Sequence, residues 1–144
     1  MAETETYLGF DFGTRRIGVA VGQRLTGTAS ALETIRSEKK AVRWQAIDRL
    51  VQCWRPAGFV VGIACQADGG DNPVTPLMRK FCRQLEGRYH RPVHTMDEYL
   101  TSFESRQLLF GELGLRAGKV HRYNDQVAAR LILQTWLNHQ ETPA

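Results

Sequence analysis

Residues 7–21 read YLGFDFGTRRIGVAV, two apolar runs joined by a short polar turn. Asp11 ends the first run, where an ionised carboxylate is costly to bury and therefore needs a cation or a hydrogen-bonding partner. Gly13 allows a tight turn whose backbone can approach a phosphate group, and Arg15 and Arg16 add positive charge to that turn. The segment predicts a β-hairpin suited to phosphate chemistry. The structural alternative is a hairpin in which Asp11 only caps the turn through the backbone.

The remainder of the chain alternates between strand and helix patterns. Apolar spacing and turn residues predict strands over 26–35, 59–63 and 93–96, and helices over 40–54, from 73, over 101–110 and over 124–138. Three apolar helix positions that should face the core are Cys53, Trp54 and Leu77. The fold class is therefore α/β, a five-stranded mixed sheet in which three antiparallel strands are followed by parallel strands, flanked by helices.

Length and composition limit the functional classes. With 144 residues, the chain is expected to form one domain, residues 1–144, with a sizeable core. No apolar run approaches the about 18 residues that span a bilayer, and the acidic start of the chain lacks the apolar region of a signal peptide, which predicts a cytoplasmic protein. The three cysteines form no zinc pattern with the four histidines. The net charge of +4 would attract a polyanion without identifying one.

Acidic side chains fall at three strand ends or helix starts, where side chains open onto a crevice. Asp11 ends the first predicted strand, Glu98 follows the last strand together with Asp97, and Asp125 is in the first turn of the final helix. If the fold brings them together, they repel one another unless cations lie between them. Their convergence would therefore imply a metal site. Taken singly, Asp97 and Glu98 can be polar turn residues, and Asp125 can simply favour the positive end of the helix dipole.

Mg²⁺ or Mn²⁺ is the cofactor that this ligand chemistry predicts, because hard divalent cations prefer oxygen ligands. Two such ions about 3.5–4 Å apart can generate a hydroxide nucleophile and hold the leaving oxygen of a phosphodiester in line. Asp11, Glu98 and Asp125 would then be both the metal ligands and the catalytic residues of a hydrolase. Asp97 could replace Glu98, because the pattern does not fix where the last strand ends.

Basic residues precede and follow these acids in the sequence. A loop that leads into the final helix contains Arg116, Lys119 and Arg122, so a backbone phosphate held there would be near the metal ions. Arg15 and Arg16 come from the hairpin. These five residues are the predicted nucleic-acid-binding set, and a solvated basic loop is the alternative for the first three.

Motifs along the chain resemble those of the YqgF (RuvX) family. They run in order from about residue 7 to 137 and comprise FDFGT (10–14), IGVAVG (17–22), TGTA (26–29), VG (61–62), DG (68–69), DE (97–98) with LTS (100–102), and Asp125 with AA (128–129). The family is similar in fold to RNase H and to the RuvC-type Holliday junction resolvases, which implies an RNase H-like domain here. By position, the resemblance implies that Asp11, Glu98 and Asp125 are the metal-binding catalytic carboxylates. The chain departs from the family pattern at Tyr99, where an arginine is usual.

The resemblance implies activity on nucleic acid. We expect a metal-dependent endonuclease that processes the 5′ end of pre-16S rRNA in ribosome biogenesis. One alternative is a Holliday junction resolvase acting on branched DNA, which would need a twofold homodimer. Another is a non-catalytic nucleic-acid-binding protein in transcription. An ATPase of the actin kind is disfavoured, because it needs two lobes and 144 residues provide one.

Overall fold

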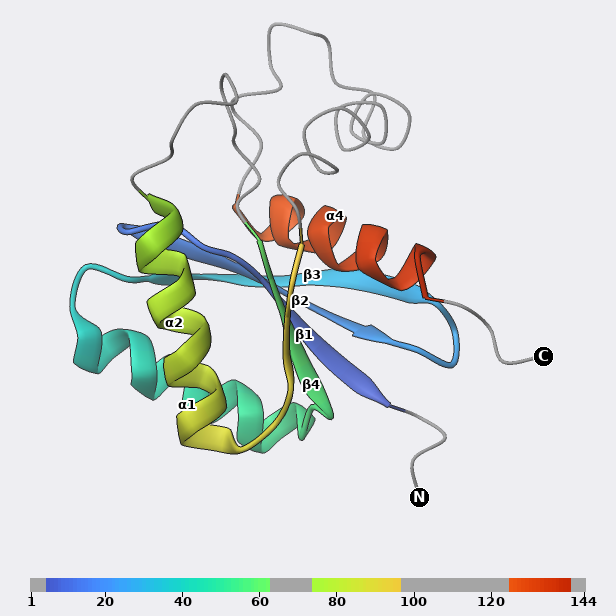
Figure 1. Ribbon diagram of the computed structural model, residues 1–144, viewed down its shortest axis with the longest axis horizontal. Coiled ribbons are helices and arrows are strands. Elements are labelled where there is room, and N and C mark those ends of the chain that lie inside the picture. Colours follow the sequence, from blue (N-terminus) through green and yellow to red (C-terminus); the bar gives the residue numbers. More distant parts are fainter. Residues whose placement is uncertain (1–4, 63–73, 97–124, 141–144) are drawn as a thin grey trace, which may run out of the picture.

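The computed structural model describes residues 5–62, 74–96 and 125–140 (Figure 1). Its elements are β1 (Thr6–Asp11), β2 (Arg16–Gln23), β3 (Thr28–Arg36), α1 (Lys40–Trp54), β4 (Gly58–Gly62), α2 (Val74–Tyr89), β5 (Val93–Thr95) and α4 (Asp125–Asn138). The strands form one sheet in the order β3-β2-β1-β4-β5. The β1–β2 and β2–β3 pairs are antiparallel, and the β1–β4 and β4–β5 pairs are parallel. The predicted five-stranded mixed sheet is confirmed, whereas the helix predicted over 101–110 lies outside the described residues.

Helices α1 and α2 cover one face of the sheet, and α4 covers the other (Figure 1). Side chains along β1 alternate between these two layers. Leu8 and Phe10 belong to the apolar cluster on the α1 and α2 side, where the Phe10 ring centroid is 5.6 Å from that of Phe81. Tyr7 belongs to the cluster on the α4 side. The same alternation places Asp11 on the α4 side. Every helix in the described ranges is too short or too polar to traverse a bilayer.

Helix α4 is held against the edge strand β3 by polar side chains spaced four residues apart. Gln134 accepts a hydrogen bond from the Ala29 N–H at 3.0 Å, and Arg130 Nε donates to the Ala29 carbonyl oxygen at 3.2 Å. One turn earlier, the Thr34 hydroxyl donates to Gln126 Oε1 at 3.2 Å. Residues four apart lie on one face of a helix. These bonds therefore fix the rotation of α4 about its axis and the position of its N-terminus.

Three apolar side chains that the helix patterns placed in the core are exposed instead. Leu77 is 47% exposed and Trp54 is 37% exposed, and Cys53 is also exposed. At 100° per residue, Cys53 lies about 120° around α1 from Ile47, which is fully buried. Trp54 is the last residue of α1, before Arg55 turns the chain away with a φ of 46°. Leu77 borders a cavity between α1 and α2.

His94 is expected to make the protein less stable under mildly acidic conditions. Its ring packs against Trp136 with a centroid separation of 4.9 Å, and burial lowers its pKa from the ordinary value of 6.5. As the pH falls below about 6.5, the unfolded chain takes up a proton at His94 before the folded protein does, so the free energy of unfolding decreases. Urea unfolding at pH 7.5 and 5.5 measures this loss. The loss should be smaller in His94→Asn, and an equal loss in the two proteins would contradict the assignment.

Candidate active site

Asp11 ends β1 between two glycines. Its Cα partners are Gly18 on β2 and Gly62 on β4. Side chains at paired positions share one face of a sheet, and a Cβ added to Gly62 would lie 3.2 Å from Ile132 of α4. Asp11 therefore lies on the α4 face, where it is half-buried. Because both partners are glycine, neither adjacent strand places a side chain beside its carboxylate at this level.

The turn between β1 and β2 is tied to the end of the sheet. Phe12 donates its backbone N–H to the Gly62 carbonyl oxygen at 2.8 Å. A Cβ at Gly13 would lie 2.5 Å from the Arg16 carbonyl oxygen, so this position needs glycine for space, although its φ is not in the left-handed region. The predicted hairpin is confirmed. Contact between its backbone and phosphate stays a prediction.

Helix α4 begins in direct contact with the strand position opposite Asp11. A Cβ at Gly18 would lie 1.8 Å from the Asp125 carbonyl oxygen and 2.8 Å from the Gln126 nitrogen. The two backbones can approach this closely only because Gly18 has no side chain. Since Gly18 is the strand partner of Asp11, the first residue of α4 lies beside Asp11 on the same face. The structure thus brings together two of the predicted acids, Asp11 and Asp125.

Arg16 forms an ion pair with Asp125. Its Nε atom lies 3.0 Å from Asp125 Oδ2, and the two side chains are 67% and 30% exposed. An ion pair this exposed is weak, because water screens it. The sequence predicts Arg16 as a phosphate-binding residue but does not indicate this carboxylate partner. The Asp125 carboxylate therefore already has a positively charged partner, and a divalent cation at the same carboxylate would have to compete with it.

Several predicted residues lie outside the described ranges: Asp97, Glu98, Arg116, Lys119 and Arg122. Met96, the last described residue before the first of them, donates its N–H to the Val61 carbonyl oxygen at 2.9 Å. Within residues 5–62, 74–96 and 125–140, no group of three His, Cys, Asp or Glu side chains is arranged to hold a metal ion. The two acids that are described supply hard oxygen donors of the kind that Mg²⁺ and Mn²⁺ prefer, so they fit the predicted cofactor.

The sheet and its helices form an RNase H-like fold that is shared with solved Holliday junction resolvases. RuvC of Thermus thermophilus, in complex with a Holliday junction substrate, is similar with a TM-score of 0.57 at 17% identity, covering 92% of this chain and 93% of that one. The fowlpox virus Holliday junction resolvase gives a TM-score of 0.54 at 10% identity, covering 94% of this chain and 99% of that one. At these identities the similarity shows the fold alone.

The chain belongs to the RuvX family, whose model, described as Holliday junction resolvase, matches residues 5–139. A relative from Methylococcus capsulatus, named "Putative pre-16S rRNA nuclease", is 52% identical over 133 residues, which cover 92% of this chain and 88% of the relative. A relative of the same name from Azotobacter vinelandii is 41% identical over 144 residues, covering 100% of this chain and 99% of the relative. The resemblance seen in the motifs is confirmed, and the chain is a member of a nuclease family.

Sequence reasoning missed the residues that position the two acids. Gly18 and Gly62 appear in the sequence only as members of apolar motifs, although a glycine in the strand next to an acidic strand end is a usable signal. The polar contacts of α4 with β3 were also missed. Their signal is the spacing of Gln126, Arg130 and Gln134, which repeats every four residues on an otherwise apolar helix.

Proposed function

We propose that this chain, residues 1–144 acting as one RNase H-like nuclease domain, is a cytoplasmic, metal-dependent endonuclease that processes the 5′ end of pre-16S rRNA in ribosome biogenesis. The observation that carries the proposal is the placement of Asp125 beside Asp11 across Gly18. Two carboxylates on one face at the end of a sheet provide a start for a metal site that hydrolyses phosphodiesters. The names of the relatives supply the substrate class.

In this proposal Asp11, Glu98 and Asp125 bind Mg²⁺ or Mn²⁺. When bound, such ions supply Lewis-acid stabilisation of charge on the phosphodiester and activate water for attack. Asp11 is positioned by the pairing of β1 on both of its edges. Asp125 is positioned by the first turn of α4, where the helix dipole favours a carboxylate. Asp97 is the alternative to Glu98 as the second ligand.

Basic side chains bind the substrate backbone in the same proposal. Arginine suits this role because its guanidinium donates paired hydrogen bonds to phosphate oxygens. Arg16, which is paired with Asp125 in this structure, would bind the phosphate backbone when the carboxylate holds a metal ion. The full phosphate-binding set comprises Arg15, Arg16, Arg116, Lys119 and Arg122.

A second candidate function is the resolution of branched DNA. It is favoured by the description of the family model and by the fold shared with RuvC. Symmetric cleavage of a four-way junction needs two active sites related by a twofold axis, so this function requires a homodimer, whereas trimming an rRNA precursor does not. A non-catalytic role in transcription would require binding alone.

Cleavage assays on two substrates separate these functions. The purified protein is incubated with a pre-16S rRNA fragment and with a four-way DNA junction, each in Mg²⁺, Mn²⁺ or EDTA. We expect metal-dependent cleavage on the 5′ side of the rRNA fragment. Cleavage of the junction alone would support the Holliday junction resolvase function instead. Binding of either substrate without cleavage would support the non-catalytic role.

Arg16→Gln is expected to tighten metal binding. The Arg16 guanidinium lies 3.0 Å from Asp125 Oδ2, so its positive charge would oppose a divalent cation at the same carboxylate. An exposed ion pair is worth about 0.2–1 kcal/mol, which corresponds to an increase in Mn²⁺ affinity of up to about fivefold. Mn²⁺ titration followed by electron paramagnetic resonance measures this change.

The control for this prediction is Arg24→Gln. It removes the same charge and breaks the 3.3 Å ion pair of Arg24 with Glu5, just past the opposite end of β2. Arg24→Gln should leave the Mn²⁺ affinity unchanged. An affinity that is equal or weaker in Arg16→Gln would contradict the competition between Arg16 and the metal.

A further inference from the structure

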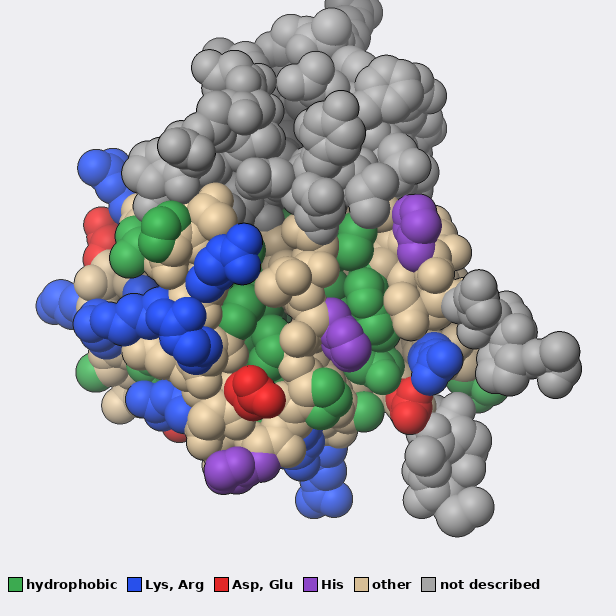
Figure 2. Space-filling view, viewed as in Figure 1, with side chains coloured by type: hydrophobic (Ala, Val, Ile, Leu, Met, Phe, Trp, Pro, Cys, Tyr) green, Lys and Arg blue, Asp and Glu red, His purple; other side chains and the backbone are tan. Residues whose placement is uncertain are grey.

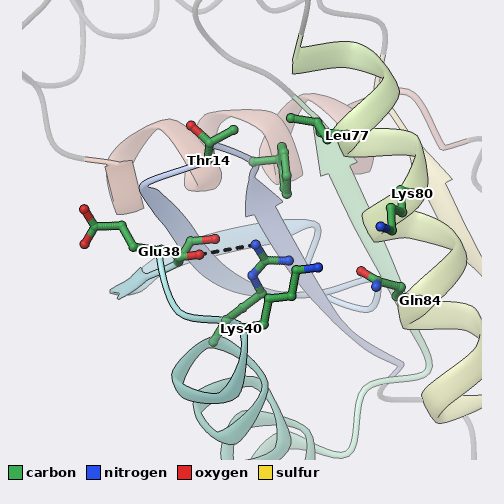
Figure 3. Close-up of a pocket in the computed structure, with 9 residues that line it drawn as sticks. Thr14, Glu38, Lys40, Leu77, Lys80 and Gln84 are labelled. Carbon is green, nitrogen blue, oxygen red and sulfur yellow. Dashed lines mark hydrogen bonds between the residues drawn. The ribbon is translucent and has the colours of Figure 1, made fainter.

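A cavity of about 170 Å³ lies between the start of α1, the side of α2 and the β1–β2 turn (Figure 3). It is on the sheet face opposite α4, and it adjoins the same turn that follows Asp11. Figure 3 shows Lys80 and Gln84 projecting from α2 toward the side chains of α1. The polar residues that line the cavity are Thr14, Ser37, Glu38, Lys40, Arg43, Lys80 and Gln84.

The first turn of α1 opens onto this cavity. Helix α1 begins at Lys40, and its N-cap residue, Lys39, makes no capping hydrogen bond through its side chain. The first turn contains no acidic residue. The first backbone N–H groups and the positive end of the helix dipole therefore have no anionic side chain in the first turn to offset them. Such a helix start attracts anions, but a ligand site requires a further observation.

That further observation is a buried hydroxyl at the cavity. Among the described residues, Ser37 Oγ and Arg43 Nε are buried side-chain atoms without a hydrogen-bond partner. Ser37 is 1% exposed and lines the cavity. Buried polar atoms in folded proteins nearly always have a partner. An oxygen-rich ligand that enters the cavity beside Ser37 would supply the acceptor that its hydroxyl lacks.

Positive charge dominates the lining of the cavity. Lys40, Arg43 and Lys80 oppose one acidic residue, Glu38, whose carboxylate points away from the others in Figure 3. Arg43 donates from Nη2 to the Ser37 carbonyl oxygen at 3.2 Å, so this bond leaves its charge without a counter-ion. Burial lowers the pKa of Arg43, which indicates a partly desolvated cation. A bound anion stabilises a desolvated cation more than a solvated one, because less water screens the attraction.

We infer that this cavity binds one phosphate group of the nucleic-acid backbone, across the β1–β2 turn from Asp11 and Asp125. The inference rests on the proposed function, because it requires a nucleic-acid strand that crosses the β1–β2 turn and reaches both the cavity and the two carboxylates. The Ser37 hydroxyl and the first N–H groups of α1 donate to the phosphate oxygens, while the lysines and Arg43 balance the charge. The cavity thus positions the substrate at a phosphate other than the one that is cleaved.

The surface next to the cavity favours a polyanion over a free phosphate ion. Figure 2 shows Lys and Arg side chains gathered over α2. Helix α2 contributes four exposed basic residues and one acidic residue, Glu86. A basic surface that continues beyond a single phosphate site suits a backbone with many phosphates. The four basic residues are Arg79, Lys80, Arg83 and Arg88.

The test measures binding in the absence of cleavage. In EDTA, inorganic phosphate is titrated while the amide NMR signals of residues 37–43 are followed, and a fluorescein-labelled single-stranded RNA is titrated by anisotropy. Lys80→Gln, which alters the cavity, is compared with Arg79→Gln, which removes the same charge from the adjacent position of α2 but does not line the cavity. Ser37→Ala tests the buried hydroxyl in both titrations.

We expect inorganic phosphate to shift the amide signals of residues 37–43 in the native protein and in Arg79→Gln, but less in Lys80→Gln and Ser37→Ala. Lys80→Gln should weaken RNA binding about two- to fivefold and reduce the slope of log affinity against log salt by about 0.7–1. The absence of a phosphate shift, or equal effects of Lys80→Gln and Arg79→Gln on that shift, would overturn the site. Phosphate shifts combined with an RNA affinity that Lys80→Gln leaves unchanged would show a site for the free ion and overturn the backbone assignment.

A separate variant distinguishes failure of this site from failure of the proposed function. Asp11→Asn removes cleavage if the proposed function is right, but it leaves the cavity and both titrations in EDTA unchanged. A native protein that binds as expected and cleaves nothing would therefore refute the nuclease proposal and retain the phosphate site.

Discussion

Asp11→Asn is expected to slow phosphodiester cleavage about 10²- to 10⁴-fold, because Lewis-acid stabilisation by a bound metal is worth several kcal/mol and each 1.4 kcal/mol corresponds to a factor of ten in rate. Asparagine has nearly the shape of aspartate but lacks the charge that holds a divalent cation. The strand partners of Asp11 are both glycines, so the substitution leaves no neighbouring side chain on those strands to rearrange. The expected loss is therefore one of chemistry and not of folding.

The measurement is a single-turnover cleavage rate at saturating Mg²⁺, accompanied by the midpoint of thermal unfolding. Glu86→Gln is the matched control, because it also neutralises one carboxylate but lies exposed on α2. We expect the control to cleave at the native rate. Native cleavage by Asp11→Asn would remove Asp11 from the site, whereas a large fall in its unfolding midpoint would point to a structural role.

Gly18→Ala is expected to destabilise the protein by about 1–3 kcal/mol or more, because a side chain added to a packed contact forces backbone shifts. The new Cβ would lie 1.8 Å from the Asp125 carbonyl oxygen and 2.2 Å from its carbonyl carbon. Both are backbone atoms, so no side-chain rotation can relieve the overlap. The start of α4 must move away from β2, and Asp125 moves with it. Cleavage should therefore fall together with stability.

Gly87→Ala makes the same chemical change at an open position. Apart from its chain neighbours and the adjacent backbone of α2, no atom of the described residues lies within 4 Å of a Cβ added to Gly87. Because alanine is favoured over glycine inside a helix, this variant should be more stable than the native chain by about 0.5–1 kcal/mol. Urea unfolding measures the free energy of unfolding of both variants. Cleavage rates are then compared per folded molecule. A Gly18→Ala protein as stable and as active as the native chain would show that α4 does not depend on this contact.

The hairpin and the order of the elements could be predicted because they depend on local patterns. The helix predicted over 40–54 is observed as Lys40–Trp54, where apolar residues repeat with the helical period and Pro56 follows. The third strand begins at Thr28, two residues later than predicted. The delay has a local cause, since Gly27 has a φ of +69° and belongs to the turn.

The site could be predicted only in part. The sequence placed Asp11 at a strand end and Asp125 at a helix start, and the structure puts these positions side by side. Their approach depends on backbone contact between β2 and α4, which no local periodicity encodes. The partner of Arg16 and the cavity beside Leu77 likewise depend on segments far apart in the chain. The participation of Glu98 stays a prediction.

The central strand and the last helix are attached to the molecule in different ways. Strand β1 is paired on both edges, whereas α4 packs on one face of the sheet and is bonded to the edge strand β3 through Gln126, Arg130 and Gln134. Asp11 can shift only if the sheet itself deforms. Asp125 can be moved by substitutions at the polar contacts between α4 and β3. Related or engineered chains can therefore adjust the position of Asp125 relative to Asp11 by altering these contacts and leaving the centre of the sheet untouched.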